Sequence, residues 1–154
     1  MNQKILFYRA NEVPYGIFSN FDTKHPIIVE GKEWVSTEHY FQAQKFAGTP
    51  HEEAVRLVEK PRDAAAMGRD RSRPLRTDWE EVKDDVMRKA IWAKFTQYPD
   101  LRYILIETGD AELVEHTTND YYWADGGDGT GKNMLGKILM QVREDLRFVT
   151  DYRG

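Results

Sequence analysis

The most constraining feature of this sequence is a C-terminal stretch whose apolar residues recur at helical spacing. Five apolar side chains fall on one face of a helix that begins after a glycine-rich loop: Leu135, Ile138, Leu139, Val142 and Leu146. A second stretch, EEVKDDVMRKAIWAKF at 80–95, places apolar residues on two neighbouring helical rows. Because two long amphipathic helices must each bury an apolar face, the fold is organised around helix packing.

Shorter segments supply the remaining secondary-structure patterns. Helical patterns occur in TEHYFQAQKFAG, HEEAVRLVEK and PDLRYILIETG. Strand patterns occur at residues 5–9, in the two halves of PIIVEGKEWVS around a turn at 30–32, and at 113–116, where helix is the alternative. The sequence therefore predicts a mainly helical α+β fold, a single domain over residues 1–154, whose small sheet comes chiefly from the N-terminal third.

Composition excludes several classes of function. A chain of 154 residues with 40% hydrophobic content can bury one sizeable core, and a net charge of -4 gives no global attraction to a polyanion. The absence of cysteine excludes disulfides, thiolate nucleophiles and cysteine-based zinc sites. The N-terminal apolar run is too short for a signal peptide, and no stretch approaches the roughly 18 apolar residues of a membrane span. A cytoplasmic protein without membrane contacts is expected.

The stretch GGDGTGKN at 126–133 differs from the nucleotide-binding P-loop by having Asn133 where a hydroxyl residue would hold magnesium. It follows TTNDYYWAD, which is polar and aromatic rather than a buried strand, so ATP hydrolysis is not expected. Its glycines let backbone amides approach a phosphate at the start of the helix that follows. A turn in which the glycines only satisfy backbone geometry is the alternative.

A polar row lies on the predicted helix in TEHYFQAQKF. Glu38, Gln42 and Lys45 share one narrow face, flanked by Phe41 and Phe46. Burial would raise the pKa of the carboxyl and lower that of the amine unless the two groups pair. Such a pair suits acid-base work or imine-forming catalysis by lysine, and an ordinary surface pairing through Gln42 is the alternative.

A run of arginines in MGRDRSRPLRTDW offers candidates for binding phosphate, at positions 69, 71, 73 and 76. Arg69 is the preferred one because the backbone of Gly68 can approach a ligand beside it, and a solvated loop is the alternative. The four histidines show no metal-binding spacing, so no metal is expected.

Four segments together resemble one known family: FSNF at 18–21, EWVSTEHYFQAQKF at 33–46, AAAMGRDRSRPLRTDWEEVKDDVMRKAIWAKF at 64–95 and LVEHTTNDYYWADGGDGTGKNMLGKILMQVRE at 113–144. In this order they resemble the YbiA-like, or NADAR, family over nearly the whole chain. The resemblance implies a mostly helical N-glycosidase without a metal or organic cofactor. Members are linked to cleavage of ribosylaminopyrimidine phosphates, which are intermediates of riboflavin biosynthesis, and other branches remove ADP-ribose from modified guanine.

The expected function is metabolite repair, in which the C-N glycosidic bond of a small phosphorylated ribosylaminopyrimidine is hydrolysed and ribose 5-phosphate is released. One alternative is an ADP-ribosyl-guanine hydrolase that acts on nucleic acid. Another is a non-catalytic module that binds ADP-ribose or NAD, although binding alone needs no paired acid and amine.

The resemblance also suggests a role for each motif residue. Lys45 is the lysine of the site and would form a Schiff base, with Glu38 moving protons; direct attack by water, with Glu38 or Asp120 as acid-base group, is the rival mechanism. The substrate-binding set is Asn20, Trp34, Gln42, Arg69, Trp123, Gly129, Gly131 and Asn133. Within it, Asn20 would bind sugar or base, the tryptophans would stack on the pyrimidine, and Arg69 with the backbone of 129–133 would hold the phosphate.

Asp120 would position Lys45 or a sugar hydroxyl. Each of these residues also has a structural alternative: Asn20 in a turn, the tryptophans in the core, Asp120 as a cap. The chain departs from the family pattern at Ala124, where relatives have glycine, and a positive φ at that position would strain or reshape the loop.

Overall fold

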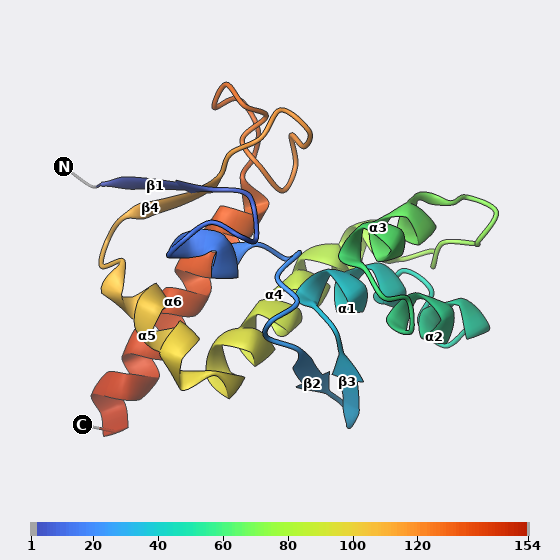
Figure 1. Cartoon of the computed structure of the whole chain (residues 1–154), viewed down its shortest axis with the longest axis horizontal. Coiled ribbons are helices and arrows are strands. Elements are labelled where there is room, and N and C mark those ends of the chain that lie inside the picture. The colour runs from blue at the N-terminus through green and yellow to red at the C-terminus, as the bar shows by residue number, and fades with distance from the viewer. Residues whose placement is uncertain (1–2, 154) are drawn as a thin grey trace. The chain divides into compact units, whose positions relative to one another are not determined.

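The computed structural model describes residues 3–153, and only the backbone of 150–153. In chain order its elements are β1 (Lys4–Phe7), the 3-10 helix η1 (Tyr15–Phe18), β2 (Ile27–Val29), β3 (Lys32–Trp34), α1 (Thr37–Gln44), α2 (Pro50–Arg56), α3 (Pro61–Arg69), α4 (Trp79–Gln97), α5 (Pro99–Glu107), β4 (Glu112–Glu115) and α6 (Met134–Arg153) (Figure 1). This confirms the mainly helical α+β class. The chain forms two compact units, one of residues 20–94 and one of the residues before and after that range.

The unit of residues 20–94 contains the predicted hairpin. β2 pairs with β3 in antiparallel fashion, and Val29 lies opposite Lys32 across a two-residue turn. Both turn residues have positive φ, 55° at Glu30 and 79° at Gly31. Two central residues of this kind give a turn whose twist matches the twist of the strands, which explains why the chain reverses at Glu30.

Helices α1, α2 and α3 pack against one another in the same unit, and α1 also contacts β3 of the hairpin (Figure 1). Thr49 caps α2 by accepting a hydrogen bond from the His51 amide, and Pro50 occupies the first turn, where no amide partner is needed. The apolar core that results consists of Ile27, Val29, Trp34, Tyr40, Ala43, Phe46, Val55, Ala64, Ala90 and Ala93. Apolar burial of this kind is the main source of the unit's stability.

Helix α3 was not expected from the sequence. It begins with Pro61 in its first turn and buries Ala64, Ala65 and Gly68. Small side chains give a weak hydrophobic pattern, so the helical period is hard to detect there. The arginine run therefore starts on a helix, because Arg69 is the last residue of α3.

The other unit contains β1, β4, α5 and α6. β1 and β4 pair in parallel, with Ile5 opposite Leu113, which confirms the strand predicted at 113–116, one residue earlier in the chain. The strands therefore form two separate pairs rather than one sheet from the N-terminal third. The backbone of α6 approaches β4 at Gly136, where a Cβ atom would lie 2.0 Å from the Leu113 carbonyl oxygen.

The predicted apolar face of α6 is buried, with all five side chains at most 2% exposed: Leu135, Ile138, Leu139, Val142 and Leu146. Aromatic contacts join β1, η1 and the end of α4 in this unit, since the Phe18 ring lies 5.6 Å from Phe7 and 5.9 Å from Phe95. Among the helices that the structure describes, none combines the length and the apolar composition needed to cross a membrane.

Candidate active site

Helix α1 is buried on nearly every side, as the sequence predicted. Its N-cap is Ser36, whose hydroxyl oxygen accepts a hydrogen bond from the His39 amide at 3.1 Å. The seven residues from Thr37 to Ala43 are all buried, including Glu38 at 8% and Gln42 at 7% exposure. Polar side chains at such positions are costly to bury unless they bind other polar groups, so their partners define the site.

Glu38 and Gln42 bind each other within α1. The Gln42 Nε2 group donates to Glu38 Oε2 at 2.8 Å, one helical turn away. The other amide atom, Gln42 Oε1, is buried and has no hydrogen-bond partner among the described residues. It lies against the backbone of Gly68 on α3, where a Cβ atom would be only 1.8 Å from it. The absence of a side chain at Gly68 thus makes room for the Gln42 amide.

Lys45 follows α1 directly, and its amine lies among aromatic rings. The Nζ atom is 5.8 Å from the Phe41 ring centre and 5.9 Å from that of Trp79. It also donates to the Gly68 carbonyl oxygen at 3.4 Å. The pKa of Lys45 is lowered from 10.5 to about 8, chiefly because burial disfavours the charged amine. The Glu38 carboxylate opposes this lowering, and the charges of Arg71 and Arg69 contribute to it. The predicted lowering of the amine pKa is confirmed.

Asn20 supports the start of α1 from the segment before β2. Its carbonyl oxygen accepts from the Glu38 amide at 3.2 Å, and its Oδ1 accepts from the Thr37 hydroxyl at 2.8 Å. Its Nδ2 group donates to the Met87 sulfur at 3.4 Å. Asn20 therefore fixes the backbone that carries Glu38, and its predicted contact with sugar or base stays a prediction.

A buried ion pair anchors the same segment. Asp22 and Lys94 are in contact at 3.1 Å, and both side chains are almost completely buried. His25 Nδ1 lies 2.7 Å from Asp22 Oδ2, the same carboxylate oxygen that Lys94 contacts. Because a buried charge without a partner destabilises a protein strongly, this cluster holds the chain that leads from Asn20 toward β2.

Trp34 is placed in the core of its unit rather than beside an open pocket. It is 2% exposed, and its ring meets Tyr40 edge-on at 5.1 Å. Its Nε1 atom is buried without a hydrogen-bond partner in the described chain. A ring this deeply buried has no open face for a pyrimidine. The packing of Trp34 therefore matches the alternative role, that of a core residue.

The arginine loop, residues 69–76, lies next to the end of α1. The Arg76 amide donates to the Lys45 carbonyl oxygen at 3.0 Å, which ties the loop to the residue that carries the amine. Arg71, one of the four arginine candidates but not the preferred one, donates through Nη2 to the Gly68 carbonyl oxygen. The sequence also missed Trp79 as a neighbour of Lys45, because contacts between distant segments carry no local pattern.

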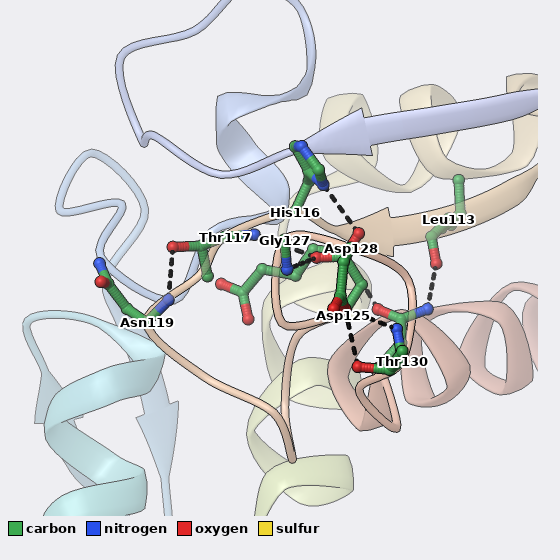
Figure 2. Close-up of polar contacts among 10 residues, drawn as sticks. Leu113, His116, Thr117, Asn119, Asp125, Gly127, Asp128 and Thr130 are labelled. Atoms are coloured by element: carbon green, nitrogen blue, oxygen red, sulfur yellow. Dashed lines mark hydrogen bonds and ion pairs between the residues drawn. The ribbon is translucent and has the colours of Figure 1, made fainter.

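The glycine loop belongs to the other unit and is organised around Asp125, a residue not singled out from the sequence. Figure 2 shows His116, Thr117 and Gly127 gathered around its carboxylate. His116 Nδ1 lies 2.7 Å from Oδ2, while the amides of Gly127 and Thr117 donate to Oδ1 at 2.8 and 3.2 Å. Desolvation raises the pKa of Asp125, but the hydrogen bonds from His116 and the two amides outweigh it, so the pKa is lowered.

The amides of the glycine loop already donate within the loop. The amides of Gly129 and Gly131 both donate to the Asp125 carbonyl oxygen, at 3.1 and 2.8 Å, and that of Asn133 donates to Ala124 at 3.0 Å. Asn133 also bridges to β4, donating to the Leu113 carbonyl and accepting from the Glu115 amide. As folded, these three positions offer a phosphate no unused amide, so the predicted backbone cradle would require one of these bonds to be replaced.

Asp120 and Trp123 lie in the turn before this loop. Asp120 Oδ1 accepts from the amides of Tyr122 and Trp123, each at 2.8 Å, which is the geometry of a turn cap. The Trp123 ring packs edge-on against Tyr122 at 4.8 Å and is half-buried. Ala124 is fully buried and is not among the residues with positive φ. The backbone strain that a positive φ would cause at this position is therefore absent.

The predicted site residues thus fall into two groups. The unit of residues 20–94 contains Asn20, Trp34, Glu38, Gln42, Lys45 and Arg69, and the other unit contains Asp120, Trp123, Gly129, Gly131 and Asn133. Within the first group, the structure brings the amide of Gln42 and the amine of Lys45 beside Gly68, and the Gln42 amide in turn binds the carboxylate of Glu38.

Comparison with known proteins places this arrangement in a family. The family model described as the NADAR domain matches residues 6–147. The chain belongs to the NADAR family. The match confirms the resemblance inferred from the four sequence segments, and these NADAR residues include every predicted site residue.

Several relatives of this NADAR chain have names that indicate an activity. It is 54% identical to N-glycosidase YbiA of Escherichia coli over 95% of this chain and 91% of the relative. It is 42% identical to an N-glycosidase of Nostoc punctiforme over 97% of both chains. It is also 43% identical to a riboflavin biosynthesis protein of Vibrio vulnificus, over 96% of this chain and 40% of that protein.

The fold is shared as well. The NMR structure of E. coli YbiA matches with a TM-score of 0.89, covering 97% of this NADAR chain and 89% of the YbiA chain. This agreement confirms the YbiA-like, mainly helical α+β fold.

Proposed function

We propose that this protein is an N-glycosidase that hydrolyses the C-N bond between ribose and the exocyclic nitrogen of a phosphorylated ribosylaminopyrimidine. The observation that carries the proposal is the half-buried Lys45 amine, with a pKa of about 8, next to a helix that holds the buried Glu38 carboxylate. The names of the E. coli and Nostoc relatives support an N-glycosidase, and the name of the Vibrio relative supports a substrate from riboflavin biosynthesis.

The lowered pKa makes Lys45 a usable nucleophile near neutral pH. With a pKa of about 8, about one amine in ten is neutral at pH 7, against about one in three thousand for a lysine at 10.5. Only the neutral amine has a lone pair to attack carbon. Placing the amine between Phe41 and Trp79 therefore raises the reactive fraction by about two orders of magnitude.

The reaction begins with ring opening. The lone pair of the exocyclic nitrogen forms a C1′=N bond as the C1′-O4′ bond breaks, and a protonated Glu38 gives its proton to O4′. The Lys45 amine then adds to C1′, and one of its protons passes through the Glu38 carboxylate to the nitrogen of the base. Cleavage of the bond from C1′ to that nitrogen releases the aminopyrimidine and leaves an imine between C1′ and Lys45.

Water completes the reaction. It adds to C1′ of the imine and loses a proton to the Glu38 carboxylate, which regenerates the carboxylic acid. The resulting carbinolamine transfers its hydroxyl proton to nitrogen, the bond from C1′ to Lys45 breaks, and ribose 5-phosphate leaves as the aldehyde. In this sequence Gln42 holds one oxygen of Glu38 in place while the other exchanges protons.

Direct attack by water, with Glu38 or Asp120 as acid-base group, is the competing mechanism. It predicts no covalent intermediate. Borohydride reduction during turnover distinguishes the two, since it would link the ribose 5-phosphate moiety to Lys45 only if the imine forms. The matched control is Lys137→Ala, which removes an exposed lysine from α6.

The decisive experiment is a mass-spectrometric turnover assay that offers a 5-phosphoribosylaminopyrimidine and ADP-ribosyl-guanosine to the wild type, Lys45→Ala and Glu38→Ala. We expect the wild type to release free pyrimidine and ribose 5-phosphate, and both variants to be inactive while folded. Release of ADP-ribose alone would assign the protein to the nucleic-acid alternative. Turnover of neither substrate, with binding of ADP-ribose or NAD, would favour the non-catalytic module.

A further inference from the structure

The four arginines of the arginine loop differ in their partners. Arg73 pairs with Asp70 at 2.6 Å, and Arg76 pairs with Asp78 at 2.6 Å. Among the side chains that the structure describes, those of residues 3–149, neither Arg69 nor Arg71 makes an ion pair with a carboxylate. Both of these side chains are exposed. Two of the four positive charges are therefore uncompensated and open to solvent.

Arg71 is oriented by backbone carbonyl groups instead. Its Nη2 donates to the Gly68 carbonyl and its Nε donates to the Arg69 carbonyl at 3.4 Å. These carbonyls close the C-terminal end of α3, where the helix dipole favours cations. A guanidinium has five N-H donors, so three remain after these two bonds. Neutral partners fix the group without cancelling its charge.

The same Gly68 carbonyl also accepts from Lys45 Nζ at 3.4 Å. Arg71 and Lys45 therefore share one acceptor, which sets the guanidinium beside the reactive amine. Arg69 is close enough for its charge to act on the same amine. A phosphate held at this place would sit next to the group that attacks the sugar.

We propose that Arg71, together with Arg69, forms an anion subsite that binds the phosphate of the substrate beside Lys45. The identity of the molecule that carries the phosphate rests on the proposed function. The subsite itself rests on the uncompensated charges and on the shared Gly68 carbonyl. Arg71 supplies the remaining N-H donors of a fixed guanidinium, a geometry that suits bidentate binding of phosphate.

Isothermal titration with inorganic phosphate and with ribose 5-phosphate tests the subsite without any need for turnover. We expect Arg71→Gln to weaken both affinities by about 10- to 100-fold, since a charge-assisted hydrogen-bonded contact is lost. Arg73→Gln is the matched control, and we expect it to change them by less than about twofold because Arg73 is already paired with Asp70. Unchanged affinity in Arg71→Gln, or no saturable phosphate binding by the wild type, would overturn the proposal.

A kinetic readout separates a binding role from a merely structural one. Removal of the Arg71 charge raises the pKa of Lys45, so the acid limb of kcat/KM shifts to higher pH in Arg71→Gln and not in Arg73→Gln. Phosphate binding that depends on Arg71 without turnover of either glycoside would remove the proposed function and leave the subsite standing. If the wild type turns over a glycoside while Arg71→Gln keeps an unaltered KM and acid limb, the subsite is refuted and the proposed function stands.

Discussion

Replacing Gly68 by alanine tests whether the Gln42 amide positions the catalytic carboxylate. The new methyl carbon would lie 1.8 Å from Gln42 Oε1, 2.7 Å from its Cδ atom and 3.3 Å from Lys45 Nζ. Real Cβ atoms essentially never come within 3.0 Å of a neighbour, so the Gln42 amide must retreat by about 1.2 Å, from 1.8 to 3.0 Å. The 2.8 Å hydrogen bond to Glu38 cannot keep its geometry through such a shift.

The cost falls on catalysis more than on folding. A hydrogen bond to a charged group contributes about 1.5 to 3 kcal/mol, so we expect kcat/KM to fall by about 10- to 100-fold if the bond persists in the transition state. Alanine in a helix is favoured over glycine by up to about 1 kcal/mol, which partly offsets the crowding. Thermal unfolding should therefore change little while activity drops.

A double-mutant cycle decides whether Gln42 transmits the effect. In Gln42→Ala there is no amide for the methyl group to displace, so adding Gly68→Ala should cost much less than it costs in the wild type. Steady-state rates of the four proteins on the phosphoribosylaminopyrimidine give the coupling. Wild-type activity in Gly68→Ala, or fully additive losses, would refute the positioning role.

Two further predictions follow from charged groups in the two units. On the acid side, the logarithm of kcat/KM should rise with unit slope up to about pH 8, because the active form of Lys45 is the neutral amine whose pKa is lowered. A pH-rate profile measures this, and an acid limb that continues to rise toward pH 10.5 would contradict it. Asp125→Ala should lower the free energy of unfolding by about 2 to 4 kcal/mol, since the amides of Thr117 and Gly127 lose their acceptor. Urea unfolding measures the loss in free energy of unfolding. Asp128→Ala, in the exposed part of the loop, is the control. Equal stabilities of the two variants would show that Asp125 does not organise the loop.

Local periodicity was enough to predict much of the fold and the central part of the site. The spacing of Glu38, Gln42 and Lys45 predicted one helical face, which the structure places on α1 and at its C-cap, and the apolar residues around them predicted burial. The turn at residues 30–32 and the buried face of α6 were likewise encoded by short-range patterns. Each of these features depends on neighbours a few residues away, which is why one sequence suffices.

Features that depend on distant segments were not predictable in this way. The contact of Gly68 with Gln42 joins α3 to α1, and α3 itself has too few large apolar side chains to show its period. The role of Asp125 arises because its carboxylate meets amides on both sides of a turn, a geometry with no periodic pattern. In the same way, only the structure distinguishes the paired arginines from the unpaired ones.

The closed set of hydrogen bonds in the glycine loop also bears on entropy. Ordering one flexible residue costs roughly 1 to 2 kcal/mol, so a disordered glycine-rich segment would greatly weaken any ligand that had to organise it. Here the Asp125 carboxylate and carbonyl already hold the amides of Gly127, Gly129 and Gly131. These glycines therefore serve shape rather than mobility, and the cost of ordering the loop is met during folding, before any ligand arrives.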